Sequence, residues 1–191
     1  MNEPVPTWVP LLRLIHWASA ALIISALSLG IYMVQLVDDS AYRFDLTQTH
    51  KSIGITVIVL TVARLWLRTL TTAPGAAPAP AWLFLAAKAT HLGLYGLLLF
   101  LPLSGWLMAT TSPLRLPTHI FGVFALPYPL APDLMTYRIT HAVHVMAAVL
   151  LATLILLHIS AAMFHGLSGR WSPTGRGRLQ GVRPGARQGA R

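Results

Sequence analysis

The chain has 191 residues, of which 55% are hydrophobic and only 10% are charged. Soluble domains average roughly 45–50% apolar and 25% charged residues, so this composition argues against a soluble fold. The formal net charge is +9, but the basic residues gather at the ends of apolar segments and form no stripe that would indicate nucleic-acid binding. The chain has no cysteine, which leaves histidine as the available ligand for any redox centre.

Four apolar stretches are long enough to cross a hydrocarbon layer about 30 Å thick as helices. In chain order they cover about residues 11–36, 50–70, 86–111 and 138–165. The segments between them are a polar loop at 38–48, a Pro/Ala linker at 73–80 and a Pro-rich connection at 112–133. The sequence therefore predicts an all-α, integral membrane four-helix bundle of up-down-up-down topology within residues 11–166.

The ends of the chain are predicted to lie on one side of the membrane, because the number of spans is even. Ten of the Lys and Arg residues lie in segments on that side and four on the other, although six of the ten belong to the Gly/Pro-rich tail. Positive residues favour the cytoplasmic side. We therefore expect a multi-pass protein of the bacterial inner membrane, with residues 1–10 and a disordered basic tail at 167–191 both cytoplasmic.

Eight histidines in so apolar a chain are the main functional signal, because ionisable groups inside spanning helices are costly. His144 and His158 are 14 residues apart. In a helix this spacing corresponds to about 21 Å of rise and brings the two side chains within about 40° of the same face. The spacing predicts two ligands on one helix, each near a different membrane surface.

Each of these ligands needs a partner at matching depth on another helix. His16, at the cytoplasmic start of the first helix, matches His158, and His50, at the outer start of the second, matches His144. These pairs predict two haem b groups with bis-histidine iron ligation, held in the core of the bundle. Zinc is the rival interpretation, but it requires four ligands at one level. A lone histidine could also be a packing or proton-relay residue.

The same register recurs on the partner helices. Gly30 follows His16 by 14 residues and would give the outer haem room. Arg64 follows His50 by the same spacing and could pair with a propionate of the inner haem; snorkelling to the interface is the alternative. His91 could serve a propionate, a quinone or only the interface. His119, His141 and His165 are expected not to be ligands.

Motifs from all four predicted helices resemble the bacterial cytochrome b561 family of four-helix di-haem proteins. They are RLIHWASA at 13–20, THKSIG at 49–54, HLGLYGLLLFLPLSGWLMA at 91–109, FGVFALPYPLAPD at 121–133 and the final helix around its two spaced histidines. The resemblance covers about residues 10–166. It implies haem ligation by His16, His50, His144 and His158. The sequence departs from the family at Val145 and at Met163-Phe164.

The resemblance further implies electron transfer between a donor and ubiquinone, with superoxide:ubiquinone oxidoreductases among its best-known members. A donor such as superoxide would be attracted by basic outer residues, for which Lys51 and Arg138 are candidates. One alternative function is a membrane anchor subunit that carries electrons for a separate dehydrogenase or a periplasmic redox protein. Another is a haem-bearing structural or sensor protein. Membrane lipid is the remaining expected partner, and nucleic acid is not expected.

Overall fold

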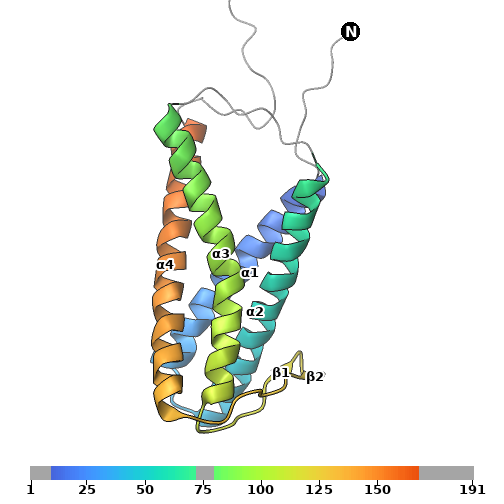
Figure 1. Ribbon diagram of the computed structural model, residues 1–191, viewed down its shortest axis with the longest axis vertical. Helices are drawn as coiled ribbons and strands as arrows, with labels where there is room; N and C mark the ends of the chain where they lie inside the picture. Colours follow the sequence, from blue (N-terminus) through green and yellow to red (C-terminus); the bar gives the residue numbers. More distant parts are fainter. Residues whose placement is uncertain (1–9, 72–79, 168–191) are drawn as a thin grey trace, which may run out of the picture.

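The computed structural model describes residues 10–71 and 80–167, with side chains described as far as residue 164. Four long helices account for most of it (Figure 1): α1 (Pro10–Gln35), α2 (Ser40–Thr69), α3 (Ala81–Thr111) and α4 (Leu134–Leu167). Each is long and apolar enough to span a membrane. The prediction of an all-α membrane bundle is confirmed. The predictions for residues 1–9 and 168–191 lie outside the described residues.

Successive helices run in opposite directions, so each end of the bundle gathers one kind of connection. We call the end with Pro10, Thr69, Ala81 and Leu167 the terminal end, and the opposite end, with Gln35, Ser40, Thr111 and Leu134, the loop end. In the described part, α1 packs along α2, α2 along α3 and α3 along α4. Toward the terminal end the α1–α2 pair separates from the α3–α4 pair (Figure 1).

A small apolar core joins the four helices halfway along the bundle. Its buried members are Ile23, Val57, Leu101, Ala147 and Leu151. Ile23 lies seven residues after His16 and Val57 seven after His50. Leu151 is likewise midway between His144 and His158. The predicted ligands therefore lie at two levels with an apolar layer between them.

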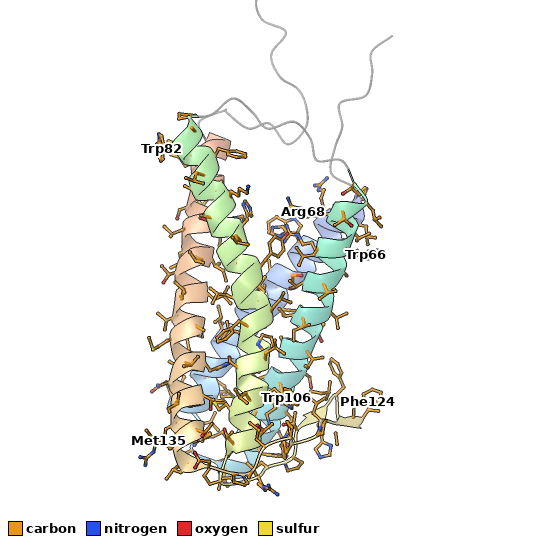
Figure 2. All side chains as sticks on the ribbon, in the orientation of Figure 1. Trp66, Arg68, Trp82, Trp106, Phe124 and Met135 are labelled. Carbon is orange, nitrogen blue, oxygen red and sulfur yellow. The ribbon has the colours of Figure 1, made fainter. Side chains whose placement is uncertain are left out.

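Most other large apolar side chains point outward. Leu14 is 66% exposed, Ile31 65% and Met146 72%, as expected where lipid rather than water surrounds the helices. Tryptophans lie toward the two ends: Trp66 and Trp82 toward the terminal end and Trp106 toward the loop end (Figure 2). This distribution is that of an aromatic belt at both membrane surfaces.

The predicted polar loop at 38–48 is wrong, because α2 begins at Ser40. Asp39 caps the helix by accepting a hydrogen bond of 2.7 Å from the Tyr42 N–H. Residues 40–49 therefore form nearly three helical turns, and the α1–α2 connection is reduced to residues 36–39. Hydropathy indicated where the apolar part of α2 begins, and the helix itself extends beyond it.

The connection between α3 and α4 contains a short hairpin that the sequence did not predict, formed by β1 (His119–Ile120) and β2 (Phe124–Ala125). It docks on the loop end of α2. The Gln48 side chain donates to the Pro117 carbonyl (2.7 Å) and accepts from the His119 N–H (3.0 Å). Lys51 Nζ donates to Thr118 Oγ1 at 2.8 Å. The hairpin thus covers α2 next to His50.

Asp133 begins α4 by accepting a 2.6 Å hydrogen bond from the Thr136 N–H. The Thr136 side chain and backbone favour the charged carboxylate and hold the pKa of Asp133 below its ordinary value. A lowered pKa stabilises the folded state above the ordinary value of about 4, and this contribution is lost as the pH falls through the lowered pKa.

We therefore expect Asp133→Ala to lower the thermal midpoint, followed by helical circular dichroism in detergent, at neutral pH. The difference from the wild type should shrink below about pH 4, where the carboxylate becomes protonated. Asp38→Ala is the matched control, because Asp38 is also exposed at the loop end and caps no helix. Equal midpoints for the wild type and Asp133→Ala at neutral pH would contradict the capping role.

Candidate cofactor site

The loop level is formed by His50 from α2 and His144 from α4. Their ring centroids are 6.4 Å apart and their planes are inclined by 72°. Both rings are partly buried. In the described part α2 and α4 are not among the helix pairs that pack along each other, so the two histidines face each other across the bundle.

The terminal level is formed by His16 from α1 and His158 from α4, with ring centroids 6.3 Å apart and planes inclined by 78°. The structure thus brings together both histidine pairs that depth and helical register predicted. A metal–imidazole bond is about 2 Å long, so two such bonds and the halves of two rings span about 6 Å. Both separations therefore suit two axial ligands of one metal atom lying between the rings.

The donor sets do not suit a bare metal ion. Within residues 10–71 and 80–167, no group of three or more His, Cys, Asp or Glu side chains is placed to hold one. A structural zinc site needs four ligands at one level. A porphyrin iron takes its equatorial ligands from the macrocycle and needs only two from the protein, so a pair of histidines is sufficient.

Two glycines lie against the loop-level histidines. A Cβ on Gly30 of α1 would lie 3.4 Å from His50 Cε1, and a Cβ on Gly105 of α3 would lie 3.1 Å from His144 Cε1. The first is an ordinary contact, whereas the second requires the imidazole to shift by a few tenths of an ångström. Absence of a side chain at Gly105 therefore lets His144 keep its observed position.

We expect Gly105→Ala to disturb the loop level more than Gly30→Ala, because only the first substitution displaces a ring in this geometry. The predicted result is partial loss of loop-level haem in Gly105→Ala, measured by haem content per chain and by the low-spin optical spectrum. Gly96→Ala on α3 is the control, since a Cβ there would meet nothing within 4 Å. Equal haem content in Gly105→Ala and Gly96→Ala would contradict the prediction.

His144 also has a polar neighbour, the buried Ser104 of α3. Its Oγ lies 2.9 Å from His144 Nδ1 and 2.8 Å from the Leu101 carbonyl. His50 differs, because its buried Nδ1 has no side-chain partner among the described residues and its polar neighbour is the Ala26 backbone. The two histidines of this level therefore have different surroundings.

Arg64 of α2 lies at the terminal level, close enough to interact electrostatically with His16 and His158. Its guanidinium lies 5.7 Å from the centre of the Tyr95 ring of α3, and Arg68 Nη1 donates to Tyr95 Oη at 3.2 Å. Figure 2 shows Arg68 toward the terminal end of α2. The acidic residues of the described part all lie at the loop end: Asp38, Asp39, Asp45 and Asp133. Arg64 is thus half-buried, and no carboxylate of the described residues lies near it.

His91 of α3 is exposed and lies at the terminal level, with its ring 5.3 Å from that of His158. Its Nδ1 lies 2.7 Å from the Ala87 carbonyl. A carbonyl only accepts, so Nδ1 carries a proton. His91 is therefore a third histidine at this level, and it is exposed.

The remaining histidines belong to neither pair. His141 is exposed, with its ring 6.0 Å from that of Tyr137. His119 lies in β1 and lines a cavity of about 210 Å³ between α2 and the hairpin. His165 belongs to the last turns of α4, and its side chain lies outside the described residues.

Sequence reasoning missed Ser104, Gly105 and Tyr95. A signal for Gly105 was present, because it follows His91 by 14 residues, as Gly30 follows His16. The first and third helices therefore carry the same His and Gly register. Ser104 had no comparable signal, because its role depends on how far α3 is rotated against α4.

Four membrane-length helices that hold histidines in pairs at two levels have the architecture of a membrane-bound b-type cytochrome. Residues 7–172 match the family described as prokaryotic cytochrome b561. The chain is also 32% identical over 151 residues to cytochrome b561 homolog 2 of Escherichia coli (strain K12), an alignment that covers 78% of this chain and 79% of that protein. The chain belongs to the prokaryotic cytochrome b561 family and is a membrane cytochrome b involved in electron transfer.

Membership of this family implies binding of haem b, and the residues present fit such a group. The ring separations suit axial ligation, and Gly30 and Gly105 place no side chain against the loop-level rings. The four histidines lie within an apolar bundle, where a large flat apolar group is favourably buried. The structure therefore offers the ligands and the surroundings that haem b requires.

Proposed function

We propose that this protein holds two haem b groups, one ligated by His16 and His158 and the other by His50 and His144, and passes single electrons between a donor and ubiquinone. The observation that carries the proposal is the pairing of the histidines at 6.3 and 6.4 Å on two levels. Haem b with two histidine ligands supplies one-electron redox chemistry and no open iron position.

The protein's own residues would hold and separate the two centres. The histidines fix each centre to α4 and to one other helix, and the apolar layer around Ile23, Val57 and Leu151 excludes water and ions between the levels. This layer supports electron movement across the membrane without a leak of protons or ions.

We place both termini in the cytoplasm of a bacterium, which puts the terminal level on the cytoplasmic side and the loop level outside. The support is the excess of Lys and Arg at the terminal end, ten against four, and this excess comes from the six arginines of the tail. Under this orientation His91 is the residue we assign to the ubiquinone headgroup. It is exposed at the terminal level, and in its neutral form, with the proton on Nδ1, its Nε2 would accept a hydrogen bond from ubiquinol.

The donor at the loop end is either a small molecule such as superoxide or a periplasmic redox protein. The cavity of about 210 Å³ at the loop end, lined by Thr49 and Ile53 of α2 and by the hairpin, supports a small donor. Charge gives less support, because the described loop end carries four cations and four anions and so attracts anions weakly: Arg43, Lys51, Arg115 and Arg138 against Asp38, Asp39, Asp45 and Asp133.

The experiment is to purify the protein in detergent, measure haem per chain, and follow haem reduction by superoxide and its reoxidation by ubiquinone. Haem content of two per chain with a low-spin spectrum supports the ligand assignment; one per chain, or a high-spin spectrum, would refute it. Reduction by superoxide that slows with salt and in a Lys51→Gln/Arg138→Gln variant supports that donor. Reduction only by a partner protein supports the alternative role as a membrane electron-transfer subunit.

A further inference from the structure

We infer that Ser104 is a positioning residue for the loop-level haem: its hydroxyl fixes His144 with the proton on Nδ1 and the lone pair on Nε2, and thereby lowers the potential of that haem. This inference rests on the proposed ligation by His50 and His144. The Ser104 hydroxyl makes two short contacts, one to the Leu101 carbonyl and one to His144 Nδ1.

A serine hydroxyl has one proton, and two neighbours compete for it. The Leu101 carbonyl, at 2.8 Å, can only accept, whereas His144 Nδ1, at 2.9 Å, can accept or donate according to its tautomer. Both contacts are hydrogen bonds only if Ser104 donates to Leu101 and accepts from an Nδ1–H of His144. This arrangement leaves Nε2 of His144 unprotonated, as a metal ligand must be.

The hydrogen bond between Ser104 and His144 is protected from water. Ser104 is 6% exposed, and Leu101 is 8% exposed and belongs to the apolar core. Hydrogen bonds are stronger in such surroundings than in water. The neighbouring Gly105 also lies against His144, so two consecutive residues of α3 fix the ring, one by a hydrogen bond and one by the absence of a side chain.

The consequence for the haem follows from ligand basicity. A histidine that donates its second N–H to an oxygen atom becomes a more basic ligand. A more basic ligand stabilises ferric iron over ferrous iron, so the reduction potential falls. At the same level, His50 has no side-chain partner at its Nδ1 among the described residues, and its polar neighbour is the Ala26 backbone. We therefore assign the side-chain tuning of the loop-level haem to α3.

The test is a redox titration of Ser104→Ala and Ser104→Thr in the full-length protein with haem bound. It uses a His16→Ala background, in which the loop-level haem is expected to remain alone. Ser104→Ala removes the acceptor, and we expect the ratio of reduced to oxidised loop-level haem at a fixed potential to rise by up to about tenfold, which corresponds to about 59 mV for one electron. Ser104→Thr keeps the hydroxyl and should stay near the wild-type ratio.

The matched control is Thr110→Val, which removes a hydroxyl from the same helix. Thr110 is 1% exposed, and its Oγ1 donates to the Leu107 carbonyl rather than to a histidine. In Thr110→Val we expect the loop-level haem to keep the potential and the ferric electron paramagnetic resonance g values of the wild type. Ser104→Ala should shift both quantities. If Ser104→Ala instead loses the haem while Ser104→Thr and Thr110→Val retain it, the positioning role is equally supported.

Two results would overturn the inference. One is retention of haem in Ser104→Ala with unchanged potential and g values. The other is the same shift in Ser104→Thr as in Ser104→Ala, which would make side-chain shape rather than the hydroxyl responsible. Failure of the proposed ligation would look different, because His144→Ala would then keep the loop-level haem.

Discussion

Replacing His158 by alanine is expected to remove the terminal-level haem and to leave the loop-level haem in place. His158 and His16 face each other at 6.3 Å, and an iron atom that loses one axial histidine loses its low-spin state and most of its attachment to the bundle. His50 and His144 lie on the far side of the apolar core and should be unaffected. Haem content per chain and redox-resolved optical spectra measure the result.

Double variants give a sharper form of this prediction. Residues that bind one group act as a unit, so His16→Ala, His158→Ala and the double variant should all lose the same haem and no more. A variant that combines one change from each pair, His158→Ala with His50→Ala, should lose both haems. His141→Ala is the control, because His141 lies on the same helix and belongs to neither histidine pair; its ring contacts Tyr137.

His91 makes the assignment of the terminal-level ligand testable. Its ring is 5.3 Å from that of His158, closer than the ring of His16. If His91→Ala removes the terminal-level haem and His16→Ala retains it, the ligand pair is His91 and His158, and the predicted role of His16 is wrong. We expect the opposite result, with His91→Ala keeping both haems and losing only its response to ubiquinol.

The histidine pairs could be predicted from the sequence because helical geometry alone relates residues that are 14 positions apart. The backbone fixes the rise and the angle per residue, so depth and face follow from residue number once the spans are known. The same argument extended to α3 would have found Gly105 from His91. Gly105 was missed because the 14-residue spacing was considered on α1, α2 and α4 but not on α3.

Contacts that depend on helix rotation or loop conformation could not be predicted in the same way. Ser104 reaches His144 because α3 packs along α4 with that face inward, and many rotations would satisfy the hydropathy of so apolar a helix. The hairpin at β1 and β2 is positioned by side chains of α2, chiefly Gln48, far from it in the sequence. Hydropathy carries no information on such polar contacts between distant segments.

Arg64 is the residue outside the histidine pairs whose replacement should have the largest effect. It is half-buried at the terminal level between His16 and Tyr95, and the described part offers it no carboxylate. A partly buried guanidinium without an anion is unfavourable. We infer that a propionate of the terminal-level haem supplies the missing negative charge, through the bidentate geometry that arginine favours.

Arg64→Ala is therefore expected to weaken retention of the terminal-level haem by about 10–100-fold, the usual effect of losing a partner in the outer shell of a metal site. The effect is measured as the rate at which haem passes to a haem-binding acceptor protein. Arg64→Lys should lose haem at a rate between those of the wild type and Arg64→Ala, because it keeps the charge and loses the bidentate geometry. Lys88→Gln is the control, since it removes one positive charge from an exposed position at the same end of the bundle. Equal haem loss in Arg64→Ala and Lys88→Gln would show that the net charge of this end, rather than the position of Arg64, determines haem retention. Wild-type retention in Arg64→Ala would instead assign Arg64 to the membrane interface.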